Sequence, residues 1–121
     1  MNEMKLGAVE SRFADIIWQH EPLSSGELAR LAEAELAWKR TTTYTILKRL
    51  CDRGIFQNQK GAVTSLISRQ DFYALQSERF VEDTFEGSLP ALVAAFGTRK
   101  KLSDQEIDQL QQLIDEMRRQ S

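Results

Sequence analysis

The chain is poor in the residue types that build catalytic and metal centres. Its 121 residues include one histidine, His20, and one cysteine, Cys51. A single histidine excludes a histidine-based metal or catalytic cluster, and a single cysteine excludes an internal disulfide. The sequence contains neither a phosphate-binding glycine loop nor a zinc-ligand spacing. These absences argue against an enzyme, and we expect neither a metal nor another cofactor.

Long hydrophobic runs are absent as well. No apolar segment approaches the roughly 18 to 20 residues that span a bilayer. The first residues lead into alternating apolar and charged positions and show no signal-peptide pattern. Together with the single cysteine, this predicts a cytoplasmic protein that does not associate with membranes. The hydrophobic fraction of 41% and the charged fraction of 28% are typical of a globular protein.

The net charge of -2 is distributed unevenly along the chain. Residues 1–37 carry three basic and seven acidic side chains, residues 38–70 carry seven and one, and residues 71–121 carry six and ten. The charges of these segments are therefore -4, +6 and -4. Phosphate binding needs a local positive field rather than a basic protein, because salt screens exposed charges beyond roughly 8 Å. Residues 38–70 are thus the candidate nucleic-acid-binding segment, whereas the overall acidity favours a protein-interaction module.

Residues 41–53 have the pattern of an amphipathic helix with a polar, cationic face. We expect Thr41 or Thr42 to cap its start and Gly54 to follow its end. The apolar face is predicted to comprise Thr43, Ile46, Leu47 and Leu50. The opposite face comprises Thr41, Tyr44, Thr45, Lys48 and Arg49. Because no carboxylate precedes Asp52, this face suits contact with DNA; the alternative is the solvated face of an ordinary helix.

Two helices and a hairpin are predicted around this helix. The first spans about residues 6–20, and a capping-box spacing of Ser24 with Glu27 starts the second, which precedes the helix of residues 41–53 after a brief loop. This is the order of a helix-turn-helix. Residues 55–59 and 63–67 are predicted to be strands that are joined at Lys60-Gly61. The hairpin would form the wing of a winged helix, with Lys60 placed to meet a phosphate or the minor groove.

The rest of the chain is predicted to be helical and apolar on one side. Helix starts are marked by Ser68 with Asp71, Ser88 with Pro90, and Ser103 with Glu106. Residues 97–101 are predicted to form a polar, basic loop. Two copies of the chain that pack together would bury these apolar sides. The alternative is that the C-terminal helices fold back onto the winged helix of their own chain. The expected dimer contacts are Phe80, Leu89, Leu92, Val93, Phe96, Ile107, Leu110, Leu113, Ile114 and Met117.

The predicted fold class is therefore mainly α. A winged helix-turn-helix of three helices and a β-hairpin occupies residues 1–70, and a helical dimerisation region occupies residues 71–121. Trp18 and Trp38 lie at helical positions beside leucines, where core packing is more common than a stacking role. Cys51 lies near the buried face of its helix and is expected to be a small core residue rather than a redox sensor.

Several short motifs occur along the chain in the same order as in one known family. The helix motif consists of Trp38, Thr42, Thr43, Thr45, Leu47, Arg49-Leu50 and Arg53-Gly54. The others are Leu6-Gly7 with Glu10 and Trp18, Leu66-Ile67-Ser68 before Phe72, and Gly87-Ser88-Leu89 with Leu92-Val93. This order resembles the penicillinase repressor family, winged-helix repressors that include methicillin-resistance regulators and copper-responsive repressors. The resemblance covers essentially the whole chain.

The resemblance implies a dimeric, sequence-specific repressor that binds a palindromic operator in double-stranded DNA through helix 41–53. The expected DNA contacts are Arg40, Thr41, Thr42, Tyr44, Thr45, Lys48, Arg49 and Lys60. Arg49 lies at the edge of the apolar face, so a structural ion pair is its alternative role. A winged-helix interaction module and a ligand-sensing regulator are the alternative functions.

The resemblance also bears on induction. Copper-responsive members carry a C-terminal cysteine cluster, and a chain with Cys51 as its single cysteine lacks that sensor. Members regulated by a membrane sensor are cut between Asn and Phe, and the matching peptide here is Ala95-Phe96. The phenylalanine is retained and the asparagine is not. The resemblance thus makes Ala95-Phe96 a candidate cleavage site and a sensor peptidase a candidate partner.

Overall fold

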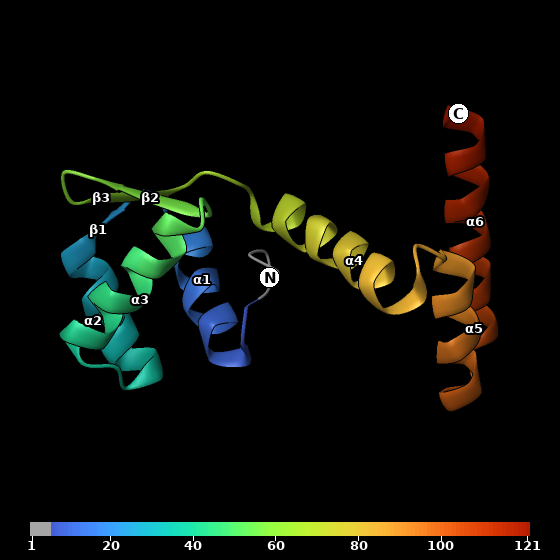
Figure 1. Ribbon diagram of the computed structural model, residues 1–121, viewed down its shortest axis with the longest axis horizontal. Coiled ribbons are helices and arrows are strands. Elements are labelled where there is room, and N and C mark those ends of the chain that lie inside the picture. The colour runs from blue at the N-terminus through green and yellow to red at the C-terminus, as the bar shows by residue number, and fades with distance from the viewer. Residues whose placement is uncertain (1–5) are drawn as a thin grey trace. The chain divides into compact units, whose positions relative to one another are not determined.

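The computed structural model describes residues 6–121, so the first five residues, part of the segment searched for a signal peptide, lie outside the described chain. Residues 6–121 form six helices and a three-stranded antiparallel sheet (Figure 1), which confirms the predicted mainly α, winged helix class. The chain divides into two compact units, one ending at Arg79 and the other spanning Phe80–Ser121. None of the helices in residues 6–121 is both long and apolar enough to cross a membrane.

The first unit begins with helices α1 (Ala8–His20) and α2 (Ser25–Leu36), as the sequence pattern predicts. The capping box of α2 is confirmed. Oγ of Ser24 accepts a hydrogen bond from the Glu27 amide at 3.0 Å, and the Glu27 carboxylate accepts one from the Ser24 amide at 3.4 Å. This reciprocal pair satisfies two amides that the first turn of a helix leaves without partners.

Helix α3 (Arg40–Asp52) starts one residue earlier than predicted. Its N-cap is Lys39, so the prediction that Thr41 or Thr42 caps the helix is wrong, and both threonines lie in its first turn. The carbonyl of Lys39 accepts the Thr43 amide at 3.0 Å, and the cap uses no side-chain hydrogen bond. Gly54 follows the helix with φ of 81°, which confirms the predicted left-handed residue at this end.

The sheet consists of β1 (Leu23–Ser24), β2 (Phe56–Gln59) and β3 (Ala62–Ser65) in the order β1-β3-β2. The predicted hairpin of β2 and β3 is confirmed, with strands shorter than expected. Strand β1 was missed, because two residues are too few to show the alternation typical of a strand. Leu23 pairs with Val63, so the segment before α2 forms an edge of the sheet.

The core of the first unit joins the three helices to the sheet and to the start of the next helix, α4 (Arg69–Phe85). Its largest fully buried side chains are Phe13, Ile17, Leu28, Thr43, Leu50, Ile55, Phe56, Val63 and Phe72. The rings of Trp38 and Phe13 pack in a tilted arrangement with centroids 5.0 Å apart, and Trp18 also packs against the core. Burial of each large apolar side chain is worth about 1.5–3 kcal/mol, so packing fixes how α3 presents its other face.

The second unit contains the end of α4, then α5 (Leu89–Arg99) and α6 (Asp104–Gln120). Oγ of Ser88 accepts the Ala91 amide at 3.1 Å, and Oγ of Ser103 accepts the Glu106 amide at 3.1 Å, which confirms both helix starts. The prediction of a loop over residues 97–101 is wrong for most of that segment, because α5 continues to Arg99. A helical glycine costs only about 1 kcal/mol relative to alanine, so Gly97 need not end the helix.

Candidate nucleic-acid interface

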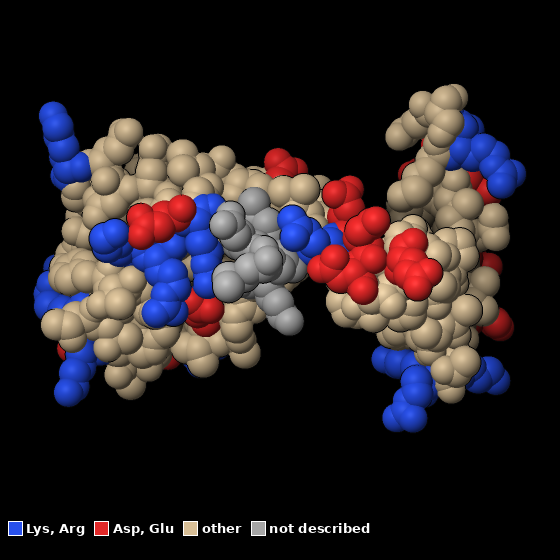
Figure 2. All heavy atoms as spheres, viewed as in Figure 1, with Lys and Arg blue, Asp and Glu red and all other residues tan. Residues whose placement is uncertain are grey.

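Helix α3 has one buried side and one exposed side. Thr43, Leu47 and Leu50 are buried, and each predicted DNA-contacting residue of the helix is exposed. The exposed set comprises Arg40, Thr41, Thr42, Tyr44, Thr45, Lys48 and Arg49. Figure 2 shows Lys and Arg side chains over the part of the molecule where Figure 1 places α3, and acidic side chains gathered over the later part of α4. All seven predicted residues that lie on α3 are therefore exposed.

Arg40 and Tyr44 are held together near the start of α3. Nη1 of Arg40 donates a hydrogen bond to the phenolic oxygen of Tyr44 at 3.3 Å. The residues are four positions apart, a spacing that places side chains next to each other on a helix. Tyr44 is 40% exposed, and because its oxygen accepts in this bond its hydroxyl hydrogen is not used there, so the pair offers a cation and a polar donor at one place.

The hydroxyl of Thr45 is already engaged by the helix. Oγ1 of Thr45 donates to the carbonyl oxygen of Thr41 at 2.8 Å, a back-bond across one helical turn. The hydroxyl hydrogen is therefore used, whereas the oxygen lone pairs and the methyl group remain on the exposed side. Thr45 can accept a hydrogen bond from a ligand or make an apolar contact without breaking its bond to the backbone.

Lys48 lies on the same face and is paired within the helix. Its Nζ is 3.0 Å from Oδ2 of Asp52, and the two side chains are 77% and 66% exposed. Exposed pairs of this kind contribute little, because water and salt screen them. A phosphate can therefore replace Asp52 as the partner of Lys48 at small cost.

Arg49 points to the edge of α3 and pairs with α1. Its Nη1 lies 3.6 Å from Oε2 of Glu10, while Oε1 of Glu10 accepts a hydrogen bond from the Gly7 amide at 3.3 Å. Of the two roles that the sequence left open for Arg49, this geometry supports the structural ion pair. The contact with Glu10 was not predicted, because nothing local in the sequence joins the two residues.

Lys60 lies at the tip of the wing and not on α3. Lys60 and Gly61 form the two-residue turn with φ of 55° and 86°, the conformation of a tight hairpin turn. Oδ1 of Asn58 accepts the Gly61 amide at 3.0 Å and closes the turn. This role of Asn58 was not predicted, although asparagine often bonds the backbone of its own turn.

Comparison with known proteins bears directly on this arrangement. The sequence matches the family model described as Penicillinase repressor over residues 6–116. The chain belongs to the penicillinase repressor family. The match confirms the resemblance seen in the sequence, and it extends through α5 into α6, so the second unit is part of the family pattern.

Curated relatives of this penicillinase repressor family member align over nearly their full length. The penicillinase repressor of Bacillus licheniformis is 27% identical over 116 residues, which are 93% of this chain and 91% of the relative. The methicillin resistance regulatory protein MecI of Staphylococcus aureus strain Mu50 is 24% identical over 114 residues, or 91% of this chain and 93% of the relative. MecI of Mammaliicoccus sciuri is 23% identical over 114 residues, with the same coverage.

The single cysteine of this family member lies beside the interface. Cys51 is half-buried and packs against the core of the first unit. Burial raises the pKa of its thiol and the charge of Asp52 raises it further, while Lys48 opposes the shift. The thiol is therefore held in its protonated, less reactive form, as expected for a residue that packs rather than reacts.

Proposed function

We propose that the protein is a dimeric, sequence-specific DNA-binding transcriptional repressor that binds a palindromic operator through α3. The observation that carries the proposal is the exposed face of α3, where hydroxyls and cations stand together opposite the side that packs on the core. In helix-turn-helix proteins the second helix of the motif enters the major groove, where base edges differ in their donors and acceptors. Helix α3 holds that position after α2.

The side chains divide into two roles by their reach and charge. Arg40, Lys48 and Lys60 are assigned to phosphates, because each ends in an exposed cation. Thr41, Thr42, Tyr44 and Thr45 are assigned to base edges or to nearby phosphate oxygens. Since its hydroxyl hydrogen is engaged by Thr41, we assign Thr45 an accepting role toward an exocyclic amino group, or contact of its methyl with thymine.

Dimerisation is supported by apolar surface in the second unit. A groove of about 380 Å³ between α5 and α6 is lined by Leu92, Val93, Phe96, Leu102, Glu106, Gln109, Leu110 and Leu113. Nine predicted contact residues of these two helices and α4 are large hydrophobics that are between 40% and 57% exposed: Phe80, Leu89, Val93, Phe96, Ile107, Leu110, Leu113, Ile114 and Met117. Exposure of so many large apolar side chains is typical of an interface, and a second copy would cover them.

Dimerisation also serves the proposed operator. A palindrome presents two half-sites about 34–36 Å apart, or a multiple of that distance, and a two-fold protein can occupy both. Each winged helix alone would reach one half-site with fewer phosphate contacts, so its binding would be weaker and less specific. Separation of the two second units would therefore release the operator.

We propose in addition that the Ala95-Phe96 bond is the site at which a sensor peptidase would act. The bond lies inside α5, and Phe96 is 48% exposed and lines the groove. A cut there would divide α5 and remove one wall of the groove. The test is the size of the chain before and after induction in cells. Cleavage should give one fragment that ends at Ala95 and one that begins at Phe96, and derepression with the chain intact would contradict cleavage at this bond.

The experiment that tests the DNA proposal is selection from a pool of random duplexes at two salt concentrations. Recovery of a palindromic site, bound with a steep salt dependence, is the expected result. The matched variant Thr45→Val should recover a pool with weaker preference at one base pair of each half-site. A pool without any enriched sequence, with weak binding at physiological salt, would overturn the proposal and leave the interaction module in its place.

A further inference from the structure

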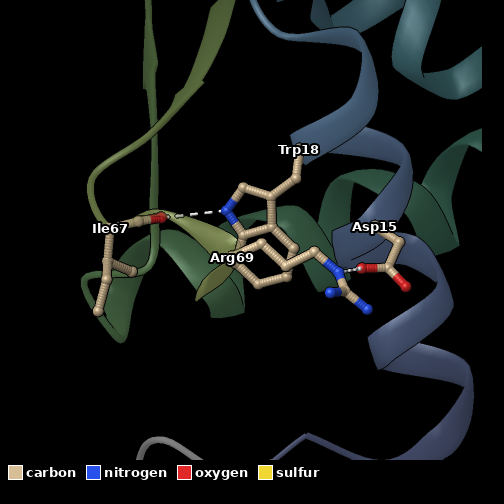
Figure 3. Close-up of polar contacts among 4 residues, drawn as sticks. All are labelled: Asp15, Trp18, Ile67 and Arg69. Carbon is tan, nitrogen blue, oxygen red and sulfur yellow. Dashed lines mark hydrogen bonds and ion pairs between the residues drawn. The ribbon is translucent and has the colours of Figure 1, made fainter. Parts of the chain in front are cut away.

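The first residue of α4 and the segment just before it are joined to α1 by two polar contacts between residues that are 54 and 49 positions apart. Nε of Arg69 donates to Oδ1 of Asp15 at 2.7 Å, and Nε1 of Trp18 donates to the carbonyl oxygen of Ile67 at 3.0 Å. Figure 3 shows Asp15 and Trp18 projecting from α1 toward the segment that leads into α4. We call these two contacts the α1–α4 junction.

Aromatic rings surround the α1–α4 junction. The indole of Trp18 lies 5.6 Å from the ring of Phe72 and 6.0 Å from that of Tyr73, measured between centroids. The guanidinium carbon of Arg69 lies 4.8 Å from the centroid of the Tyr73 ring. Phe72 is fully buried and fixes where α4 meets the core. A single apolar anchor leaves the direction of a helix poorly defined, and the two hydrogen bonds just before Phe72 restrict it further because each has a preferred geometry.

Helix α4 is also the covalent link between the two units, because the boundary after Arg79 falls within it. An α-helix rises 1.5 Å per residue, so the 17 residues of α4 span about 25 Å. A change of about 10° in its direction at the first turn moves its far end by about 4 Å, which exceeds the roughly 3.4 Å rise of one base pair. A small change in the direction of α4 at the α1–α4 junction would therefore displace its far end by more than one base-pair step of an operator.

We propose that Asp15 and Arg69 are positioning residues that set the half-site spacing accepted by the dimer. They do so by fixing the direction in which α4 leaves the winged helix. The inference rests on the proposed function, since spacing has meaning only for two winged helices on one palindrome. Neither residue lies on the exposed face of α3, so neither is needed for reading a half-site.

The test uses the full chain and the palindromic duplex that the wild-type protein selects from a random pool. Affinities are measured for that duplex, for duplexes with one base pair added or removed between the half-sites, and for a single half-site. Arg69→Gln and Asp15→Asn should each reduce the preference for the selected spacing by about threefold or more. Exposed ion pairs are individually weak, but each dimer would carry two junctions. Affinity for the single half-site should stay within about twofold of wild type.

The two variants separate a positioning role from a general effect of charge. Arg69→Gln removes a positive charge and Asp15→Asn removes a negative one, so a field effect on DNA affinity would have opposite signs. Loss of the contact, in contrast, should lower the preference for the selected spacing in both Arg69→Gln and Asp15→Asn. The matched control is Arg12→Gln, which removes a positive charge from α1; Nη2 of Arg12 donates to the Glu35 carbonyl of α2 at 3.1 Å. This control should keep the wild-type spacing preference.

Two results would overturn the inference. One is an unchanged spacing preference in both Arg69→Gln and Asp15→Asn. The other is a loss of half-site affinity as large as the loss for the whole palindrome, which would place the effect in the winged helix itself. If the wild-type protein selects no palindrome, the proposed function fails and the positioning role fails with it. If the wild-type protein does select a palindrome, and all variants prefer its spacing as strongly as wild type does, only the positioning role fails.

Discussion

The guanidinium of Arg49 lies 3.6 Å from the carboxylate of Glu10, so a cation of α3 is paired with an anion of α1. The side chain of Glu10 is 21% exposed and that of Arg49 is 51% exposed. Within the described residues, Oε2 of Glu10 makes no hydrogen bond, which leaves Arg49 as the charge that compensates it. The pair thus connects the packing between two helices to the surface that we propose for DNA.

Removal of this pair should affect stability more than DNA binding. We expect Arg49→Gln and Glu10→Gln each to lower the free energy of unfolding by about 0.5–1 kcal/mol, with less than additive loss in the double variant. Denaturant unfolding of the single and double variants measures this. The salt dependence of operator binding should be unchanged in Arg49→Gln. A slope shallower by about one unit would instead assign Arg49 to a phosphate.

Lys48→Ala should weaken binding to operator and to random DNA alike. Loss of one phosphate contact should flatten the slope of log affinity against log salt by about one unit. Asp52→Asn is the matched control, because it removes the same intrahelical ion pair and retains the cation. Titrations at several salt concentrations measure both. A change in specificity alone in Lys48→Ala would show that its assigned role is wrong.

Thr45→Val should lower discrimination between operator and random DNA and leave the salt slope unchanged. The substitution removes the hydroxyl and keeps a methyl of similar position, so the loss reports hydrogen bonding. We expect about 1–3 kcal/mol of discrimination at one base pair if the hydroxyl accepts from a base. Thr45→Ser is the complement, since it keeps the hydroxyl and removes the methyl. Equal specificity of all three proteins would exclude Thr45 from base recognition.

Leu110→Arg should prevent dimerisation, because it places a charge in the groove between α5 and α6. Sedimentation should give a monomer, operator affinity should fall strongly, and single half-site affinity should be retained. Gln112→Arg introduces the same charge on α6 at a residue that does not line this groove, and it should remain dimeric. A monomer in both variants would point to a general effect of charge on α6.

Cys51 should react slowly with a thiol reagent in the native protein and rapidly after unfolding. Burial raises the pKa of the thiol, so the folded state favours the neutral form. This contribution to stability is complete below the ordinary thiol pKa and is lost as the pH rises beyond it. Modification rates measured against pH in native and denatured protein test this. A fast native reaction at neutral pH would indicate a redox sensor.

Local signals allowed the helix starts and the hairpin to be predicted. Ser24, Ser103 and Gly54 each act on a backbone within a few residues, so their role is visible in a short window of sequence. The start of α3 was misjudged because its cap at Lys39 uses no side-chain hydrogen bond. Strand β1 was missed because its pairing with β3 comes from the tertiary structure and not from its own two residues.

The exposed face of α3 could likewise be predicted, since helical spacing assigns each side chain to a face. The partners of those side chains could not. Glu10 meets Arg49, and Asp15 meets Arg69, only because α1 packs against elements that are distant in sequence. Contacts of this kind depend on the fold as a whole, and the spacing of residues within one helix does not predict them.

The exposed hydrophobic residues of α5 and α6 have a consequence for how operator occupancy would depend on the concentration of the protein. If a second copy is what covers them, the dimer concentration follows the square of the monomer concentration wherever monomers dominate. Halving the number of intact chains would then leave about a quarter of the dimers. Operator occupancy would fall more steeply than the amount of protein, so a partial loss of chains would suffice to switch on the genes under its control.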